Sequence, residues 1–259
     1  MIPPLSAAKK SDCLASPIVE LRQYTLKPGR RETLIGIFDA HLIEGQEEAG
    51  MTIIGQFRDL DRPDMFVWMR GFDGMEARKD ALTAFYDGSV WAAWRDAANA
   101  TMIDSDDVLL LKPAWRDAGF DLSGLWRPAP VDGKKPSDAS LLASFYAIQI
   151  HHLRPGTEVN FAGNFEAQAL PVFEAFGVRP LAAFVSEHAE NSFPRLPVRV
   201  GENVFVSVTG FDSADAYARH EAALAASPEW QACRQTLQAA SAKPAQTLRL
   251  SPTARSLLR

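Results

Sequence analysis

Glu20-Leu21-Arg22-Gln23-Tyr24-Thr25-Leu26-Lys27-Pro28-Gly29 is the segment around which the chain is built, because its pattern occurs twice. The second occurrence is Ala147-Ile148-Gln149-Ile150-His151-His152-Leu153-Arg154-Pro155-Gly156, in which an apolar residue, a base, Pro and Gly recur in register. Leu26 and Leu153 mark the repeat, at an offset of 127 residues. A duplication of this kind indicates two copies of one structural unit.

The two copies can be followed along most of the chain. The offset of 127 also relates three later pairs: Phe38 with Phe165, Gly50 with Gly177, and Phe57 with Phe184. Further on the offset is 139, as three matches show: Gly71-Phe72-Asp73 with Gly210-Phe211-Asp212, Trp91 with Trp230, and Leu111-Lys112-Pro113 with Leu250-Ser251-Pro252. The second copy therefore gains 12 residues, which we place in a loop at 187–202. A loop of that length is typical of a lid or a partner surface.

Both copies have the same expected order of elements. In the first copy, apolar spacing predicts strands at 18–25, 52–58, 65–72 and 107–111, and helices at 30–49 and 74–100, the latter broken near 87–89. In the second copy it predicts strands at 145–151, 181–186, 204–210 and 246–250, and helices at 158–176 and 212–240. Pro171 should kink the first of these helices, and Ser227-Pro228 should restart the second. The order β-α-β-β-α-β is that of a ferredoxin-like unit, so we expect an α+β fold with tandem ferredoxin-like repeats.

This order divides the chain into five parts. We expect a flexible leader at 1–16, a first ferredoxin-like domain at 17–113, a connector at 114–143, a second ferredoxin-like domain at 144–252 and a fraying tail at 253–259. The connector carries four large apolar residues, which are Trp115, Phe120, Leu125 and Trp126. Side chains of this kind predict that the first half of the connector packs on the folded domains.

The first strand has one aliphatic face and one polar, aromatic face. Alternation places Val19, Leu21 and Gln23 on the aliphatic face, which we expect to lie against the helices. The opposite face carries Glu20, Arg22 and Tyr24 and continues on the neighbouring strand with Phe66, Trp68 and Arg70. These side chains are too aromatic to face water, so we expect this second face to meet the sheet of the other copy.

Composition excludes several classes of protein. The chain of 259 residues is 47% hydrophobic and 23% charged, as in a soluble globular protein, and its net charge of −5 argues against a nucleic-acid or anionic-membrane partner. Apolar runs are too short to span a bilayer, and no signal peptide precedes the first domain, which predicts a cytoplasmic location. Two cysteines, Cys13 and Cys233, cannot form a disulfide framework or a metal cluster. No phosphate-binding loop or nucleophile elbow occurs, so we expect neither a cofactor nor a metal.

The polar face of the first copy is the candidate site. Arg22 and Arg70, on adjacent strands, could bind a carboxylate or enolate, with Glu20 or Tyr24 as proton acceptor or donor and Trp68 as an apolar wall. The alternative is a structural network of Glu20 with the two arginines that merely fills the barrel. In the second copy the corresponding residues are neutral, and they are Ala147, Gln149, His151, Ser207 and Thr209.

Histidines supply a further catalytic candidate. His41 lies on the apolar side of the predicted helix at 30–49, where a buried or capping histidine is the favoured interpretation and a general base the alternative. His151 and His152 are adjacent on a strand and point to opposite faces, so they cannot chelate one metal ion. Of the two, His151 is expected to face the barrel.

The residues of the first copy resemble those of the NIPSNAP family, within the dimeric α/β-barrel, ferredoxin-like superfamily. The resemblance rests on five segments: Glu20-Leu21-Arg22-Gln23-Tyr24, Lys27-Pro28-Gly29, His41, Val67-Trp68-Met69-Arg70-Gly71-Phe72 and Phe85-Tyr86-Asp87-Gly88-Ser89-Val90-Trp91. It implies two ferredoxin-like sheets that close into a barrel, within one chain or between chains, with a small molecule inside or at the mouth. Relatives include cofactor-independent monooxygenases, isomerases or cyclases, and haem-binding enzymes.

Together these observations predict a barrel that binds a small, mainly apolar or aromatic anion and could act on it as a cofactor-independent enzyme. Glu20, Tyr24 and His41 are the catalytic candidates, and Arg22, Trp68 and Arg70 the substrate-binding ones. The alternative is a non-enzymatic interaction or assembly protein whose barrel is filled and whose loop at 187–202 contacts a partner. A homo-oligomer is expected under either hypothesis.

Overall fold

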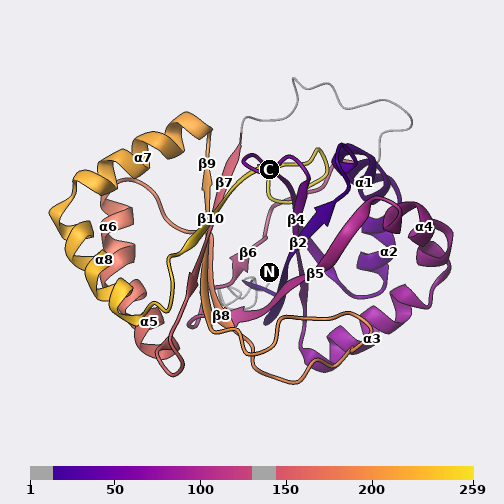
Figure 1. Cartoon of the computed structure of the whole chain (residues 1–259), viewed down its shortest axis with the longest axis horizontal. Helices are drawn as coiled ribbons and strands as arrows, with labels where there is room; N and C mark the ends of the chain where they lie inside the picture. Colours follow the sequence, from indigo (N-terminus) through magenta and orange to yellow (C-terminus); the bar gives the residue numbers. More distant parts are fainter. Residues whose placement is uncertain (1–13, 130–143) are drawn as a thin grey trace, which may run out of the picture.

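The protein is built around one closed β-barrel with helices on two sides. The computed structural model describes residues 14–129 and 144–259. Eight antiparallel strands close in the order β10-β3-β4-β2-β5-β8-β9-β7, so the barrel is completed within a single chain. Helices α1–α4 cover one side of the barrel and α5–α8 the other (Figure 1). The predicted α+β fold with two ferredoxin-like halves is therefore confirmed.

The first half follows the expected order. Its elements are β2 (Ile18–Leu26), α1 (Arg31–Ile37), a π-helical turn (Phe38–Leu42), α2 (Ile43–Glu48), β3 (Thr52–Asp59), β4 (Met65–Phe72), α3 (Met75–Tyr86), α4 (Ser89–Asn99) and β5 (Met102–Pro113). The predicted break between the two later helices is present at Asp87 and Gly88. A β-carbon at Gly88 would lie 2.8 Å from the Ala84 carbonyl oxygen, so this sharp break requires glycine.

The second half repeats this order. Its elements are β7 (Phe145–His152), α5 (Glu158–Asn164), a π-helical turn (Phe165–Ala169), α6 (Leu170–Ala175), β8 (Ala182–Ser186), β9 (Val204–Phe211), α7 (Ala214–Ala226), α8 (Pro228–Ala240) and β10 (Gln246–Pro252). Ser227 caps α8 as predicted, because its Oγ accepts a hydrogen bond of 3.1 Å from the Trp230 amide. The π-helical turn precedes Pro171, and the first half has the same turn without a proline. The irregular helix is therefore a property of both halves rather than of Pro171 alone.

The interior of the barrel is a packed apolar core. All eight strands contribute to it, and residues from the first half include Val19, Leu21, Val67 and Met69. The interior of an eight-stranded barrel is just wide enough for side chains to fill, and here they fill it. Phe120, from β6 (Phe120–Asp121), and Leu258 add to the same core.

The expected orientation of the first sheet is wrong. The aliphatic face of β2 points into the barrel, whereas Glu20, Arg22 and Tyr24 point outward, under the helices of the first half. His151 also faces helices rather than the barrel interior, because its ring lies 5.1 Å from that of Phe161 on α5. Alternation specifies which residues share a face, but aliphatic side chains pack equally well against helices or a second sheet.

Described residues from the segments outside the two halves pack on the folded domains. The strand β1 (Leu14–Ala15) pairs with β6, so this end of the predicted leader is structured. Phe120 is buried, which confirms that the connector packs on the folded domains. The predicted fraying of the tail is wrong, because Thr253, Ser256 and Leu258 are buried and Arg255 pairs with Glu44. The rest of the leader, including Cys13, and residues 130–143 of the connector lie outside the described residues.

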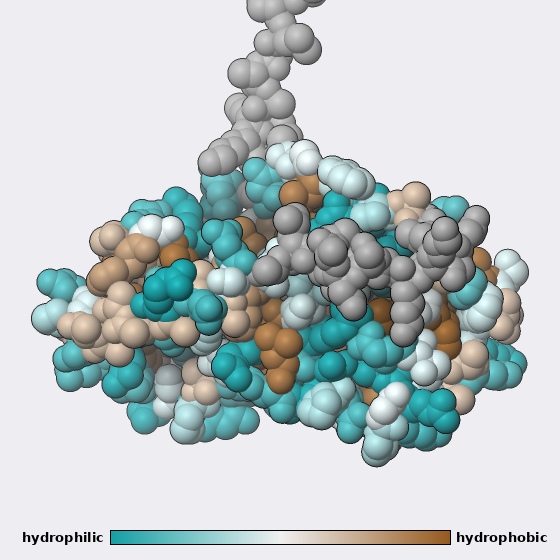
Figure 2. All heavy atoms as spheres, turned by 90° about the horizontal axis from the view of Figure 1, so that it is seen from above, coloured by the Kyte–Doolittle hydropathy of each residue, from teal (hydrophilic) through white to brown (hydrophobic). Residues whose placement is uncertain are grey.

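The long loop of the second half crosses to the first half. We call residues 187–202, which join β8 to β9, the strap. In Figure 1 the strap runs from β8 towards α3. Phe193 of the strap is buried against the first half, where its ring stacks on Tyr86 with centroids 5.9 Å apart. The strap therefore covers part of the first half of its own chain. On the face seen in Figure 2, hydrophilic and hydrophobic residues are mixed over both halves of the molecule.

Candidate functional site

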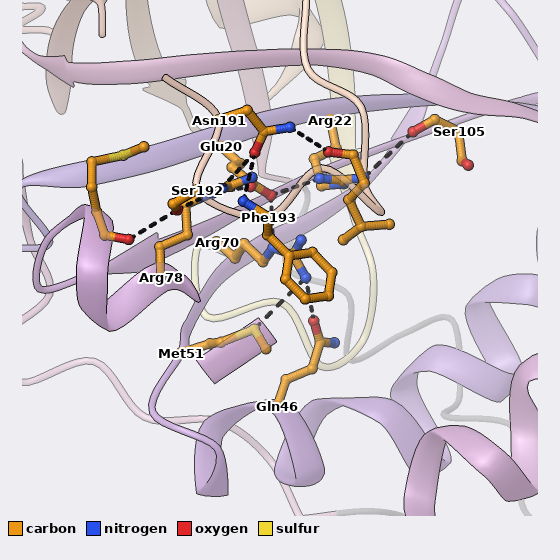
Figure 3. Close-up of polar contacts among 12 residues, drawn as sticks. Glu20, Arg22, Gln46, Met51, Arg70, Arg78, Ser105, Asn191, Ser192 and Phe193 are labelled. Atoms are coloured by element: carbon orange, nitrogen blue, oxygen red, sulfur yellow. Dashed lines mark hydrogen bonds and ion pairs between the residues drawn. The ribbon is translucent and has the colours of Figure 1, made fainter. Parts of the chain in front are cut away.

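A single buried carboxylate, that of Glu20, holds three buried arginines beneath the helices of the first half (Figure 3). Glu20 Oε2 accepts hydrogen bonds from Arg22 Nη1 at 2.6 Å and from Arg70 Nε at 2.8 Å. Glu20 Oε1 accepts one from Arg78 Nε at 2.7 Å. We call Glu20, Arg22, Arg70 and Arg78 the arginine cluster. Each of the four is at most 1% exposed.

The local fold explains why these side chains meet. Glu20 and Arg22 are two residues apart on β2 and therefore project from the same face. Glu20 lies opposite Arg70 on β4, and Arg22 lies opposite Trp68. Cross-strand neighbours on one face are close enough for their side chains to interact. Arg78 joins the cluster from the neighbouring helix α3, because it lies on the buried side of that helix.

Several neutral groups accept the remaining arginine hydrogens. Arg70 Nη1 donates to Gln46 Oε1 at 3.1 Å, and Gln46 is itself held by a bond from its Nε2 to the Leu42 carbonyl oxygen. Arg22 Nε donates to the Tyr24 hydroxyl at 3.0 Å. Arg70 Nη2 and Arg78 Nη2 are buried and have no hydrogen-bond partner among residues 14–129 and 144–259. Two donors of the cluster are thus available to a further acceptor.

Aromatic rings form one wall of the cluster. The guanidinium carbon of Arg70 lies 5.0 Å from the centre of the Trp68 ring, and that of Arg22 lies 5.5 Å from it. Arg70 also approaches the Phe72 ring at 5.5 Å. These distances are those of cation–π contacts, which stabilise a desolvated guanidinium without neutralising its charge.

The strap closes the cluster from the outside. Arg78 Nη1 donates to Asn191 Oδ1 at 2.9 Å and to Ser192 Oγ at 3.2 Å. The Ser192 hydroxyl in turn donates to the Met75 carbonyl oxygen at 3.0 Å. A cavity of about 70 Å³ lies beneath the strap and is lined by Asn191 together with Leu109 and Leu110 of β5. The strap therefore supplies neutral oxygen acceptors to a charged donor.

The cluster carries an excess of positive charge. Burial alone would raise the pKa of Glu20, but the charges of Arg70, Arg22 and Arg78 outweigh it and hold this pKa well below its usual range. The pKa of Tyr24 is raised, because burial outweighs the opposing effect of Arg22. Glu20 is therefore a carboxylate, and one negative charge faces three positive charges.

The structure brings together five of the six predicted site residues. Glu20, Arg22, Tyr24, Trp68 and Arg70 lie in or beside the arginine cluster.

The sixth, His41, is on the outer surface and stacks on Trp94 with ring centroids 3.6 Å apart. The expectation of a buried or capping histidine is wrong, because the π-helical turn changes the helical phase at residues 38–42. Phe38 and Leu42 are buried by this turn, whereas His41 points outward.

Three elements of the site were missed in the sequence. Arg78 precedes Ala81, Leu82 and Phe85 at helical spacing, and this pattern could have indicated that Arg78 lies on the buried side of its helix. Gln46 and the strap residues Asn191 and Ser192 carry no comparable signal. Their contacts with the cluster join segments far apart in the chain.

Comparisons with known proteins identify the family and the fold. The family model described as NIPSNAP matches residues 19–115 and 146–256. No curated protein sequence matches the chain significantly.

The helices of the described ranges include none long and apolar enough to cross a membrane. No group of three or more His, Cys, Asp and Glu residues in these ranges could hold a metal ion.

Solved structures of similar fold span nearly the whole chain. A proposed monooxygenase from Lactobacillus acidophilus NCFM is 12% identical with a TM-score of 0.55, and the match covers 92% of this chain and 94% of that one. A second proposed monooxygenase, from Fusobacterium nucleatum, is 7% identical with a TM-score of 0.56 and covers 92% and 93%. An anthrone oxidase-like protein is 15% identical with a TM-score of 0.53 and covers 91% of each chain. At these identities the likeness shows the fold.

Proposed function

The chain belongs to the NIPSNAP family, and we propose that it binds a small organic anion, mainly apolar or aromatic, at the arginine cluster. One observation carries this proposal. Three buried arginines face one buried carboxylate, and two of their nitrogens, Arg70 Nη2 and Arg78 Nη2, have no partner among the described residues. A buried guanidinium that lacks a counter-charge is costly, and an anionic ligand would supply that charge.

Arginine is well suited to this role. Its planar guanidinium can donate two parallel hydrogen bonds to a carboxylate, and such bonds are stronger than those between neutral groups. Arg78 donates from Nη1 to two neutral oxygens of the strap, on Asn191 and Ser192, while its Nη2 is unpaired. The oxygens of a bound carboxylate would replace these strap oxygens. Trp68 and Phe72 would contact the apolar part of the ligand.

Entry to this site requires movement of the strap. The arginine cluster is buried, and the cavity of about 70 Å³ beneath the strap is lined by other residues and is far smaller than the usual ligand pocket of roughly 300–1,000 Å³. The space for the ligand would come from Phe193 and its neighbours when the strap lifts. Phe193 is held mainly by apolar contacts, which can be remade around an aromatic ligand.

The finer proposal is a cofactor-independent enzyme of monooxygenase, isomerase or cyclase type. This chain shares its fold with two proposed monooxygenases and an anthrone oxidase-like protein. We therefore propose aromatic compounds as the first substrates to test. Glu20 has too low a pKa to accept a proton near neutral pH, so we assign it the role of holding the arginines in place. Tyr24 keeps its proton and is the proposed donor, while the surface position of His41 leaves it without an assigned role.

The alternative of an interaction or assembly protein gains no support from the strap. The strap packs on the first half of its own chain through Phe193, while others of its residues, such as Val200, are exposed. The barrel is filled by apolar side chains rather than by the Glu20 network. Homo-oligomerisation remains a prediction, since a second copy is not needed to close the barrel.

Native mass spectrometry of the purified protein tests the proposal, with benzoate and 2-naphthoate as added probes. We expect wild-type protein to bind an anion, co-purified or added, in a one-to-one complex. Arg78→Gln should lose it. Arg195→Gln should retain it, because Arg195 is an exposed residue of the strap and pairs with Asp87 at the end of α3. Equal binding by Arg78→Gln and wild type would overturn the proposal, as would the absence of any anion complex with all three proteins folded.

A further inference from the structure

The second half contains a cavity where the first half contains the arginine cluster. The larger of two adjoining spaces has a volume of about 470 Å³ and opens between β7 and α8. Six residues define its chemistry, and they are Gln149, His151, Glu221, Trp230, Arg234 and Thr247. A volume of this size lies within the usual range for small-molecule sites, roughly 300–1,000 Å³.

The smaller adjoining space, of about 20 Å³, occupies the position of the arginine cluster, and side-chain replacement between the halves explains it. The repeat places Ala147 where the first half has Glu20, Thr209 where it has Arg70, and Tyr217 where it has Arg78. The strand register agrees, since Ala147 lies opposite Thr209 as Glu20 lies opposite Arg70. Five such replacements line the smaller adjoining space, and they are Ala147, Gln149, Ser207, Thr209 and Tyr217. The charged groups are therefore absent from these positions.

Among the described residues, the loop that corresponds to the strap is too short to cover the second half. In the first half the arginine cluster is covered by the strap, which joins β8 to β9. The corresponding connection, between β3 and β4, is the short turn at 60–64. This turn reaches only as far as β10, where the Leu60 amide donates to the Arg249 carbonyl oxygen at 2.9 Å.

In the two ionisable groups of the cavity that are not exposed, His151 and Glu221, burial favours the neutral form. Nε2 of His151 is buried and has no hydrogen-bond partner in the part of the chain that the structure describes. Burial, with a smaller effect of His152, lowers the pKa of His151 to about 4, so its imidazole is neutral near pH 7. Burial also raises the pKa of Glu221. Aromatic rings surround the imidazole, with Phe161 at 5.1 Å and Phe205 at 6.1 Å between ring centres.

We propose that this cavity is a second binding site, separate from the arginine cluster, for an uncharged, flat, mainly apolar molecule that bears one hydrogen-bonding group. Trp230 and Leu237 provide apolar surface, and His151 provides the hydrogen-bond partner. Glu221 disfavours an anion there. Arg234 and Lys243 line the same cavity but are exposed side chains at its edge, so water screens their charge. The two halves thus select ligands of different charge.

Isothermal titration with a matched pair of probes tests this site. The uncharged probe is 2-naphthol and the anionic one is 2-naphthoate, which share the same rings. We expect 2-naphthol to bind wild-type protein, and His151→Phe to weaken its binding about tenfold, because the phenyl ring keeps the bulk but cannot form the hydrogen bond. Gln149→Trp, which fills the cavity, should abolish binding. Arg78→Gln should leave it unchanged.

Three outcomes would overturn the second site. The first is failure of 2-naphthol and of a panel of uncharged two- and three-ring phenols and ketones to bind at their solubility limits. The second is unchanged 2-naphthol binding by both His151→Phe and Gln149→Trp, each shown to be folded by thermal unfolding. The third is loss of binding in Arg78→Gln. Failure of the anion site has a different signature, because only 2-naphthoate binding would then be missing.

Discussion

The two halves of the molecule share a fold but use the space between sheet and helices in opposite ways. In the first half this space is filled by Glu20 and three arginines and covered by the strap. In the second half it is a cavity in which burial favours the neutral forms of His151 and Glu221, while Arg234 and Lys243 are exposed. The faces that point into the barrel do not differ in this way. Val19 and Leu21 correspond to Tyr146 and Ile148, and all four belong to one apolar core.

This difference separates two tasks of a duplicated fold. The inward face must stay apolar in both copies, because the two sheets bury it against each other. The outward face lies outside the barrel, under the helices of its own half and, in the first half, the strap, so its chemistry can differ between copies without disturbing the barrel. Single substitutions in the two halves test this contrast, and the substitution with the largest expected effect comes first.

Glu20→Gln should have the largest effect, because it removes the only carboxylate of the arginine cluster. Arg22, Arg70 and Arg78 would then be buried without their counter-charge, and we expect a loss of about 3–5 kcal/mol in the free energy of unfolding. Urea denaturation measures this loss. Glu32→Gln is the matched control, since Glu32 is exposed and pairs with Arg58, and it should cost less than about 1 kcal/mol. Equal stability of the two variants would show that the cluster does not depend on Glu20.

Phe193→Ala should loosen the strap without unfolding the barrel. Its ring is buried against Tyr86, and truncation of a buried phenylalanine costs roughly 3–5 kcal/mol. Because the ring holds only the strap, we expect the loss to appear as faster hydrogen exchange of amides at 188–198. Amides of β7 and β9 should exchange as in wild type. Uniformly faster exchange across both halves would mean that the strap is part of the global folding unit.

Acid should destabilise the second half through His151. Its pKa in the folded protein, about 4, is lower than the ordinary value of 6.5, so the unfolded chain binds the proton more tightly. The contribution of neutral His151 to the free energy of unfolding is complete above about pH 6.5 and is lost as the pH falls towards 4. His151→Phe should therefore flatten the decline of stability between pH 7 and pH 5 by on the order of 1 kcal/mol, measured by urea denaturation at each pH. Parallel declines in variant and wild type would contradict the assignment.

Other ionisable groups near His151 remain in the variant. Glu221, Arg234 and Lys243 line the same cavity, and His152 is adjacent in the chain. The raised pKa of Glu221 acts in the opposite sense, since its stability contribution falls as the pH rises. Only the difference between variant and wild type therefore reports on His151.

Arg195→Gln should have the smallest effect. Arg195 pairs with Asp87 at 2.7 Å, and both side chains are 56% exposed. Exposed pairs contribute little, so the change in the free energy of unfolding should stay within about 0.5 kcal/mol. A larger effect, again by urea denaturation, would show that the strap is held by charge rather than by Phe193.

The sequence contains most of the fold but only part of the candidate site. The repeat of the segment at 20–29 predicts two ferredoxin-like halves, and the strand at 65–72 agrees with β4 in both bounds. Alternation correctly groups Glu20, Arg22 and Tyr24 on one face. It does not say which layer that face meets, and here the long arginine side chains pack under helices rather than inside the barrel.

The remaining errors have a common physical cause. His41 depends on a π-helical turn, which no periodic pattern with 3.6 residues per turn predicts. Asn191 and Ser192 reach Arg78 across more than 110 residues of chain, and a loop sequence does not reveal its target. The tail residue Leu258 is buried because it packs into the apolar core of the barrel, which exists only after folding. Each case depends on tertiary contacts rather than on local sequence.

The attachment of the strap has a consequence for the speed of ligand exchange. Backbone hydrogen bonds fix both ends of the strap to β5, from the Glu187 amide to the Leu110 carbonyl oxygen at 2.8 Å and from the Arg199 amide to the Val108 carbonyl oxygen at 2.9 Å. If the strap opens as proposed, the movement would be confined to residues 188–198, a loop tethered at two points. Association with the arginine cluster would then saturate at the opening rate of this loop as ligand concentration rises, while the uncovered cavity of the second half would fill at a rate proportional to concentration.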